Sequence, residues 1–417
     1  MLDLTFIETN AEQVKANAAA RGYDVNIDHL LAQNARRKRL QQEVDDLRRR
    51  ANEISKGFKT DSSEAKREEA RALGAQEADR RKELAAVEAE VNDLAARVPN
   101  VLDPRVPMGD ETAFTVLRVV GSAPTFSFKP KSHEVLGTAL DVLDIPRASR
   151  AAKTRFYALK NEAVLMRMAL VRMFYDHCRP QGFELCSPPV LAKDKSLFTS
   201  GYLPFSQKDN FRIAGEDLSL IGTSEQAILG MFMDETLTKL PVLMLGDSLC
   251  FRTEAGAAGR DTTGILRAHQ FYKLEQMVLC HPDDSEKWHL QCLENEEWIM
   301  RELGVHYRVI VCSSADMGAP GRMKYDTEAW LPTQNAFREM TSNTNLADYQ
   351  ARRGGIKFKT EAGKGYVHTI SATGFVDRLL AVILECFQQE DGSVKLPPAL
   401  VPYMNGVDVL RPKGAAS

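Results

Sequence analysis

The residues best suited to chemistry flank a glycine-rich loop in the middle of the chain. Arg252 and Glu254 come at the end of an apolar stretch, 243–251, whose composition predicts a β-strand. Positions two apart on a strand face the same way, so this cation and this carboxylate are expected to project together. Beyond a loop with three glycines, Phe271 and Glu275 lie on a second predicted strand. A strand, loop and strand arranged in this way can cup a nucleotide.

Other interpretations of these residues stay open at this point. Taken alone, Arg252 and Glu254 are more often a surface ion pair that contributes less than about 1 kcal/mol. The sequence has neither a GxxxxGK[ST] loop nor a GxGxxG after a strand, so any ATP site must be of another kind. None of the seven cysteines has CxxC spacing, and no structural zinc is expected.

A long helical hairpin is predicted before these residues. From about 28 to 98 the chain is rich in Ala, Arg, Glu and Leu and contains no proline. Apolar residues alternate four and three apart, as in the seam of a coiled coil, in two groups: Leu40, Val44, Leu47, Ala51 and Ile54, then Leu84, Val87, Val91, Leu94 and Val98. The stretch 56–63 is typical of a turn. Two antiparallel arms of roughly 30 residues, about 45 Å long, are therefore expected.

Basic residues cluster on the first arm of this hairpin, at 36–39 and at 48–50. Clusters of this kind on an exposed helix can follow the phosphates of a nucleic acid. More often they form only a solvated face, and a helical hairpin is often a spacer or an oligomerisation device. The hairpin alone decides nothing about function.

The composition changes near residue 100. Val98–Pro107 carries three prolines and is typical of a linker. Beyond it, candidate strands alternate with helices, which predicts an α+β fold with antiparallel pairing. The candidates are Val242–Leu245, Gln276–Cys280, His306–Val311 and Tyr366–Ile370 for strands and Val164–His177 for a helix. We divide the chain into an N-terminal domain at 1–103, a linker at 104–125 and a second domain at 126–417.

Overall charge and hydropathy restrict the class of protein. The formal net charge of -3 leaves no global electrostatic footprint for nucleic acid, so RNA binding would need a local patch. The first residues have neither the basic and apolar layout of a secretory signal nor the Arg-rich character of a transit peptide. No run approaches the roughly 18 apolar residues that a membrane span needs. A soluble, cytoplasmic protein with reduced thiols is expected.

The string FR-x-EAG-x-AGRDT, followed by HQF and a Glu four residues after the Phe, covers residues 251–275. It resembles, without a gap, motif 2 of the seryl-tRNA synthetases, a class II family. The resemblance implies that Arg252 contacts the ATP α-phosphate and the serine carboxylate. It assigns Glu254 to the adenine amino group, Phe271 to stacking on adenine, and Glu275 to serine. Each role is chemically sensible, because an arginine fork neutralises charge that builds on phosphorus during attack by a carboxylate.

Four more segments resemble the same family in the same order. LIGTSEQ, at 220–226, would supply Thr223, Ser224 and Glu225 to the serine pocket, and 314–332 follows as the next matching stretch. In 339–353, Glu339 and Ser342 would hold the Mg²⁺ that bridges the phosphates, since this hard cation prefers oxygen ligands. In 368–402, which resembles motif 3, Arg378 would clamp the γ-phosphate and Thr373 would lie against the serine side chain. The full set implied for ATP is Arg252, Thr253, Glu254, Ala268, Phe271, Glu339, Met340, Thr341, Ser342 and Arg378.

The resemblance covers nearly the whole chain and implies its fold and activity. The second domain would be the class II antiparallel sheet flanked by helices, and the hairpin domain would bind tRNA. The motif 1 region, Leu165–Val190, would form a homodimer. The expected activity is that of a serine–tRNA ligase, which uses ATP and Mg²⁺ to form seryl-adenylate. It then transfers serine to the 3′ end of tRNA(Ser), with tRNA(Sec) as an alternative acceptor.

Three departures from the family pattern leave alternatives. Thr263 stands where the family commonly has Arg. The stretch from Thr373 to Arg378 is one residue shorter than usual, with Asp377 directly before the arginine, which affects the placement of Thr373 and Ser371. A usual pair of cysteines near 343–346 is missing. A duplicate serine-adenylating enzyme of a biosynthetic or resistance pathway, or a non-catalytic RNA-binding relative, are the competing hypotheses.

Overall fold

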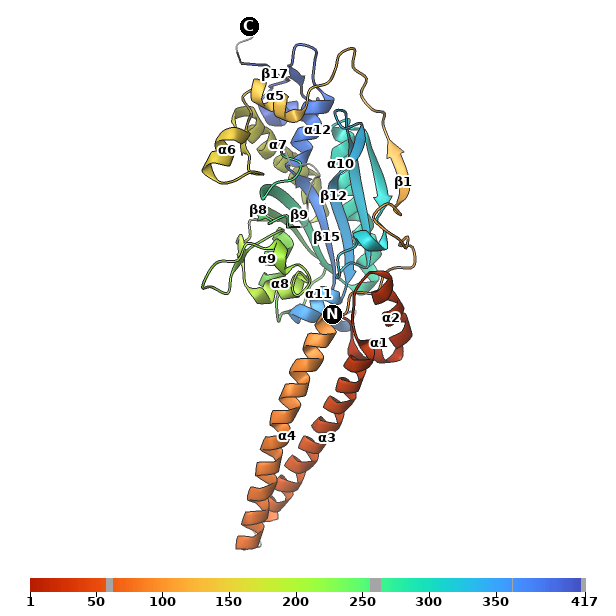
Figure 1. The fold of residues 1–417 in the computed structure, drawn as a ribbon, viewed down its shortest axis with the longest axis vertical. Helices are drawn as coiled ribbons and strands as arrows, with labels where there is room; N and C mark the ends of the chain where they lie inside the picture. The colour runs from red at the N-terminus through yellow and green to blue at the C-terminus, as the bar shows by residue number, and fades with distance from the viewer. Residues whose placement is uncertain (58–62, 256–263, 362, 414–417) are drawn as a thin grey trace. The chain divides into compact units, whose positions relative to one another are not determined.

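The computed structural model describes residues 1–57, 63–255, 264–361 and 363–413. The chain divides into two compact units, Met1–Pro99 and Asn100–Ser417, and each is described by itself (Figure 1). The second unit already contains a strand, Thr115–Val120, within the range 104–125 that the sequence suggested as a linker. This strand joins the main sheet, as described below.

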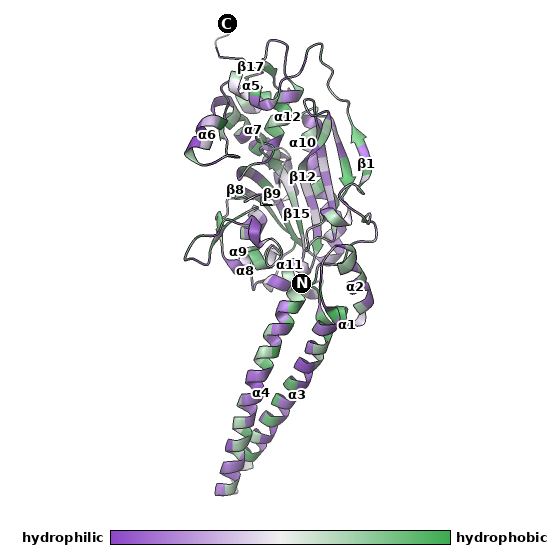
Figure 2. Cartoon of the chain, viewed as in Figure 1, coloured by the Kyte–Doolittle hydropathy of each residue, from purple (hydrophilic) through white to green (hydrophobic). Residues whose placement is uncertain are grey.

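The first unit contains the predicted hairpin. Two short helices, α1 (Leu4–Thr9) and α2 (Ala11–Ala20), precede the long helices α3 (Ile27–Gly57) and α4 (Glu64–Ala96), which lie side by side (Figure 1). Their lengths of 31 and 33 residues confirm the predicted arms. Six residues of the predicted seam are buried: Leu40, Val44, Leu84, Val87, Val91 and, just beyond α4, Val98. The outer sides of both helices are mainly hydrophilic (Figure 2). The predicted turn lies largely outside the described residues.

Part of the basic surface on α3 is neutralised by neighbouring carboxylates. Arg36 pairs with Glu83 of α4 at 2.7 Å, Lys38 pairs with Glu8 at 2.8 Å and Arg49 pairs with Asp46 at 2.9 Å. Arg39, Arg48 and Arg50 are exposed, and among the described residues no carboxylate forms an ion pair with them. Of these, Arg39 and Arg50 are eleven positions apart, about three helical turns, and so share one side of α3.

The second unit is built on an eight-stranded sheet in the order β1-β10-β11-β12-β15-β9-β8-β4. Neighbours are antiparallel except for the parallel pair β4 and β8. The strands are β1 (Thr115–Val120), β4 (Glu184–Cys186), β8 (Val242–Phe251), β9 (Gln270–Cys280), β10 (Tyr307–Val311), β11 (Met323–Leu331), β12 (Ala336–Ala347) and β15 (His368–Val376). The predicted α+β class with an antiparallel sheet is confirmed.

Two strand predictions need correction. Tyr366–Ile370 was expected to be one strand, but β14 (Gly363–Tyr366) ends and β15 begins at His368. Val367 between them is completely buried, so the apolar run continues although the strand does not. The strand predicted at 243–251 corresponds to β8, but the alternation of a strand was also applied to Arg252 and Glu254, which lie beyond its end at Phe251.

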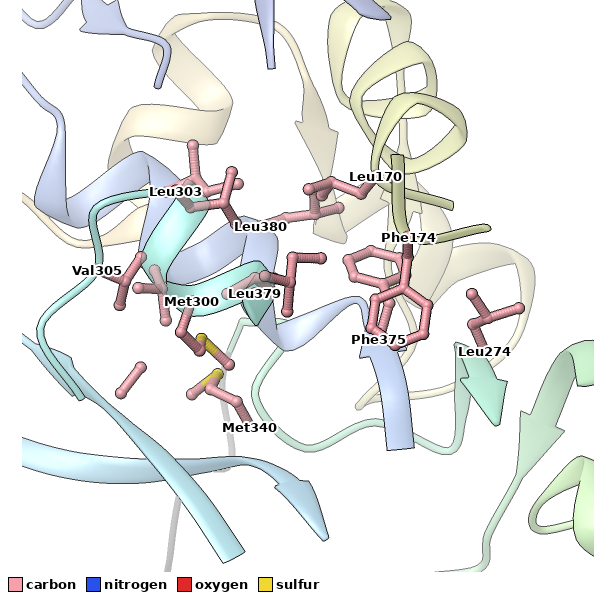
Figure 3. Packing of buried hydrophobic residues seen from close by; sticks show 14 of the residues in the cluster. Leu170, Phe174, Leu274, Met300, Leu303, Val305, Met340, Phe375, Leu379 and Leu380 are labelled. Carbon is pink, nitrogen blue, oxygen red and sulfur yellow. The ribbon is translucent and has the colours of Figure 1, made fainter. Parts of the chain in front are cut away.

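Three helices enclose the main core: α7 (Asn161–Cys178), α10 (Ser285–Glu302) and α12 (Arg378–Cys386). The predicted helix at 164–177 corresponds to α7. Phe174 of α7 packs beside Phe375 of β15 and Leu379 of α12 (Figure 3). The pairing of β15 with β9 shifts register between Thr373 and Phe375, and a Cβ on the intervening Gly374 would lie 2.6 Å from the Phe174 ring. The core therefore requires a residue without a side chain at this bulge.

The remaining elements are short. The helices are α5 (His133–Ala139), α6 (Ile145–Ala151), α8 (Asp194–Ser200), α9 (Ser224–Met231) and α11 (Tyr349–Gly354). The strands are β2 (Leu143–Asp144), β3 (Ala158–Leu159), β5 (Leu191–Ala192), β6 (Ser219–Leu220), β7 (Thr236–Leu237), β13 (Lys357–Thr360), β14, β16 (Val394–Lys395) and β17 (Val409–Leu410). All seven cysteines are free thiols. None of the helices among the described residues is long and apolar enough to span a membrane.

Candidate active site

Two adjoining cavities on one face of the sheet bring the predicted site residues together. The inner cavity has a volume of about 270 Å³ and the outer one about 490 Å³. They share a wall made by Arg252, Phe271, Glu339, Val376 and Arg378. Segments separated by more than a hundred positions in the sequence therefore meet at this wall.

The alternation of side chains along the strands explains why these residues meet. On β9, Phe271, Lys273 and Glu275 line the inner cavity, whereas Leu274 points into the core. On β12, Ser342 lines the same cavity, whereas the Thr341 hydroxyl donates a hydrogen bond to Glu296 of α10 at 2.9 Å. Helix α10 thus covers the sheet face opposite to the cavities.

The inner cavity is lined with charged and hydroxyl groups. Its members include Glu275, which accepts a hydrogen bond of 2.6 Å from the Ser371 hydroxyl and forms an ion pair with Lys273. Lys273 Nζ also donates to Thr223 Oγ1 at 3.3 Å. Thr373 pairs with Glu275 across the strands and lines the cavity as well. The shorter segment before Arg378 has therefore kept both Ser371 and Thr373 in the predicted pocket.

Charges in the inner cavity influence one another. Burial, and then the charge of Glu275, raises the pKa of Glu225 above its ordinary value. Gln350 donates a hydrogen bond to this carboxylate and also donates to Ser200 O at 2.9 Å. Burial alone would lower the pKa of Lys273, but the carboxylate of Glu275 raises it above the ordinary value. The cavity thus holds a firmly charged ammonium beside two carboxylates.

The two arginines of the shared wall are held by backbone carbonyls. Arg252 Nε donates to Gly222 O at 3.2 Å, and its guanidinium lies 5.2 Å from the centroid of the Phe271 ring. Arg378 Nη1 donates to Glu339 O at 2.7 Å and lies 3.5 Å from the Glu339 carboxylate. Burial raises the pKa of Glu339, but Arg378 and then Lys324 lower it more, so the net shift is downward. The wall therefore presents two fixed cations and one ionised carboxylate.

The outer cavity contains Glu254, whose backbone has a left-handed φ of 53°. This conformation turns the chain after β8, and Glu254 forms an ion pair with Arg267. The expectation that Arg252 and Glu254 share a strand face is therefore wrong, because the strand has ended before them. Ala268 and Phe271 line the same cavity, as the nucleotide prediction required.

Three predicted residues make contacts outside the cavity linings. Ser224 Oγ donates to Gly246 O at 3.3 Å, the Thr253 hydroxyl donates to Lys208 O, and Thr341 faces α10. Met340 is buried and lines the inner cavity. Thr263, the position of one departure from the family, lies outside the described residues.

Sequence reasoning missed several residues of the inner cavity. Lys273 could have been found, because it lies between Phe271 and Glu275 in the alternation of β9. Tyr202 and Thr344 also line this cavity. Tyr202 belongs to a segment for which no motif gave a signal.

The residues predicted to hold Mg²⁺ offer a suitable set of oxygen atoms. Glu339 and Ser342 both line the inner cavity, and Ser342 lies across from Asp326 in the β11 and β12 pair. Asp326 Oδ1 is buried and has no hydrogen-bond partner among the described residues. Hard oxygen donors with spare acceptor capacity suit a magnesium ion that retains several waters.

Comparisons with known proteins agree with this geometry. Residues 209–387 match the family model "tRNA synthetase class II core domain (G, H, P, S and T)", and residues 1–102 match "Seryl-tRNA synthetase N-terminal domain". The chain is 39% identical to a serine–tRNA ligase of Rubrobacter xylanophilus, with 99% of each chain covered. It is also 39% identical to a serine–tRNA ligase of Dictyoglomus turgidum, over 99% of this chain and 100% of the relative.

Solved structures of similar proteins cover the same length. The seryl-tRNA synthetase of Pyrococcus horikoshii complexed with ATP has a TM-score of 0.91 and 32% identity, with 99% of this chain and 100% of that chain covered. The cytoplasmic serine–tRNA ligase of Naegleria fowleri in complex with AMP has a TM-score of 0.86 and 27% identity, with 97% and 96% covered.

Proposed function

Because this chain belongs to the seryl-tRNA synthetase family, we propose that its inner cavity binds serine, that its outer cavity binds ATP, and that it joins serine to tRNA. The chain is an aminoacyl-tRNA ligase with the class II core. The observation that carries the assignment of the two cavities is the shared wall, where Arg252 and Arg378 meet between two sites of different chemistry.

The inner cavity suits a small zwitterion with a hydroxyl group. Glu275 and Glu225 can accept hydrogen bonds from an ammonium, and Thr373 and Ser371 offer partners for a hydroxyl. At about 270 Å³ the cavity favours a small side chain. Thr223 and Ser224 would complete the pocket, the latter through its backbone. The serine carboxylate would then face Arg252 at the shared wall.

The outer cavity suits an adenine nucleotide. The Phe271 ring provides a face for stacking, and Glu254 can accept a hydrogen bond from an exocyclic amine. The backbone of Thr253, Ala268, Met340 and Thr341 would contribute the remaining contacts. Arg378 would bind the γ-phosphate from the end of α12. Such pairing of arginine with phosphate is strong because both groups are charged and the fork has a fixed geometry.

The chemistry needs no nucleophile from the protein. An oxygen of the serine carboxylate attacks the α-phosphorus, the bond from that phosphorus to the pyrophosphate oxygen breaks, and seryl-adenylate forms. A ribose hydroxyl of the tRNA 3′ end then attacks the seryl carbonyl, and AMP leaves with the electron pair. Arg252 stabilises the charge that develops on the α-phosphate, and the two cavities hold the reacting atoms in line.

We also assign Mg²⁺ to this site. Glu339 and Ser342 would hold the ion beside the phosphates, where it would neutralise the charge of the departing pyrophosphate. The positive charge of Arg378 lowers the pKa of Glu339, so this carboxylate is ionised and can bind a cation.

The hairpin unit is proposed to bind tRNA through α3. The exposed Arg39, Arg48 and Arg50 can contact phosphates, whereas Arg36, Lys38 and Arg49 are paired with carboxylates. In this division the N-terminal domain of 1–103 binds tRNA(Ser), with tRNA(Sec) as an alternative. The catalytic site lies in 126–417, except that Glu111 and Phe114 also line the outer cavity. We propose a cytoplasmic location for this chain.

A homodimer through the motif 1 region is proposed from an unpartnered apolar face. On α7, Leu165 is 49% exposed and Met168 62% exposed, and Leu185 on the edge strand β4 is 45% exposed. Clustered exposed apolar residues of this kind are typical of a protein interface. A second copy of the same face would cover them.

The direct test is ATP–pyrophosphate exchange with each amino acid, followed by charging of total tRNA. We expect exchange with serine alone and subsequent formation of seryl-tRNA. Exchange without charging would favour a serine-adenylating enzyme with another acceptor, and absence of exchange would contradict the proposal.

A further inference from the structure

Asp377, the residue directly before Arg378, is anchored by four hydrogen bonds. Its side chain is completely buried. It accepts from Arg167 Nε and Nη2, both at 2.7 Å, from the backbone N of Tyr272 at 3.1 Å, and from the hydroxyl of Tyr157. Asp377 occupies the N-cap of α12, yet its side chain makes no capping hydrogen bond to that helix. Its carboxylate is therefore committed to α7 and β9 instead.

The groups around Asp377 are held in the protonation states that this network needs. Burial would lower the pKa of Arg167, but Asp377 raises it, so the guanidinium stays charged. Burial and the charge of Asp377 hold the pKa of Tyr157 well above its ordinary value, so the phenol remains a donor. Arg167 also lies over the ring of Tyr272, 5.3 Å from its centroid. The bidentate pair and the stacked ring fix the arginine in one place.

Asp377 and one of its partners, Tyr272, are each next to a residue that lines the nucleotide cavity. Tyr272 follows Phe271, whose ring is the proposed adenine platform. Asp377 itself precedes Arg378, the proposed γ-phosphate clamp, and its backbone N donates to Tyr272 O at 3.3 Å. The carboxylate thus ties together the two chain segments that carry Phe271 and Arg378. Arg167, from α7, lies on the far side of this tie and makes no contribution to either cavity lining among the described residues.

We propose that Arg167 and Asp377 are positioning residues for ATP, which set the separation of Phe271 from Arg378. The proposal rests on the assignment of the outer cavity to ATP. A bound ATP must contact the aromatic platform and the γ-phosphate clamp at the same time, so a small displacement of one segment weakens both contacts. A misplacement of about 1 Å can cost on the order of a hundredfold in rate. Phe271 and Arg378 also border the inner cavity, but serine is proposed to be held there by Glu225, Glu275 and Thr373, so its binding should change less.

The test compares KM for ATP with KM for serine in pyrophosphate exchange. Arg167→Lys keeps the charge but loses the bidentate fork, so the buried carboxylate keeps a counter-ion and the protein is expected to fold. We expect KM for ATP to rise about tenfold or more while KM for serine changes less than about twofold. Arg172→Lys is the matched control, because Arg172 lies on the same helix and pairs with Asp176 at the surface at 2.8 Å. It should match the wild type.

A second variant separates positioning from stability. Arg167→Gln with Asp377→Asn replaces the charged pair by two amides, which removes the buried charges together and avoids an unpaired one. We expect this double variant to retain cooperative thermal unfolding and still to show the selective rise in KM for ATP. If folded variants have unchanged KM for ATP, or if both KM values rise equally, Arg167 and Asp377 have no positioning role. If the wild-type protein shows no serine-dependent exchange, the proposed function itself has failed.

Discussion

At the scale of residues, Glu225 and Glu275 lie beside Lys273 in one small cavity, to which Arg252, Lys324 and Arg378 add further cations. The ammonium of serine, the proposed substrate, would join Lys273 beside these two carboxylates. Without Lys273 the empty site would hold two neighbouring carboxylates, and one of them would take up a proton. A protonated carboxyl is a poorer acceptor for an ammonium.

We therefore expect Lys273→Met to raise KM for serine by roughly tenfold or more, equivalent to about 1.4 kcal/mol of binding. KM for ATP should change much less, because the outer cavity has its own charges. Pyrophosphate exchange at varied serine and varied ATP measures both values. Lys273→Arg keeps the positive charge, so its KM for serine should lie between those of the wild type and Lys273→Met. An unchanged KM for serine in Lys273→Met would contradict the charge-balance argument.

A second buried residue predicts how stability depends on pH. Burial raises the pKa of Glu296 well above its ordinary value of 4.5, although the Thr341 hydroxyl opposes the shift. The folded protein thus keeps a proton that the unfolded chain releases. The free energy of unfolding must then fall as pH rises from the ordinary carboxyl pKa towards the raised one.

Glu296→Gln should remove this pH dependence, because the amide is neutral throughout. At pH 8 the variant should melt a few degrees above the wild type, and near pH 4 the two should coincide. Thermal unfolding followed by circular dichroism from pH 4 to 9 measures the difference. Glu302→Gln, an exposed position on the same helix, is the control and should have no effect. A lower melting temperature for Glu296→Gln at pH 8 would show that the carboxylate is ionised and stabilising.

At the scale of elements, α3 presents the few arginines that are available to RNA. Arg39 and Arg50 lie on one side of the helix and are exposed. Replacing both by Ala should raise KM for tRNA several-fold and lower the salt dependence of binding by about two ion equivalents. Pyrophosphate exchange should be unchanged, since it needs no tRNA. Arg81→Ala, which removes an arginine paired with Glu77 at 3.1 Å, is the control. Equal tRNA affinities in all three proteins would place the RNA contact elsewhere.

Local patterns predicted the hairpin but only part of the sheet. A coiled-coil seam depends on residues three and four apart, so α3 and α4 could be read directly from the sequence. The end of β8 at Phe251 was predicted too, but the left-handed turn at Glu254 was not, because it has no local signature in the sequence. The tie between Arg167 and Asp377 spans 210 positions and joins three elements, so no periodicity could reveal it. The roles of the motif residues came only from the family resemblance.

At the scale of the whole molecule, the exposed face of α7 predicts the oligomeric state. Met168→Glu places a carboxylate in the middle of this face, and desolvating it would oppose dimer formation. We expect the apparent mass in sedimentation velocity to fall from that of a dimer towards the monomer mass of 46.5 kDa. Leu290→Glu, at an exposed apolar position on α10, is the matched control and should leave the mass unchanged. A monomeric wild-type protein would contradict the proposed interface.

The bulge at Gly374 has a consequence for the evolution of this chain. A Cβ atom at position 374 would lie 2.6 Å from the Phe174 ring, so a side chain at 374 and a phenylalanine at 174 cannot fit together. Among descendants of this sequence, a larger residue at 374 should appear only together with a smaller one at 174. Positions 374 and 174 should therefore co-vary. Such co-variation would identify the relatives that share the short segment between Thr373 and Arg378.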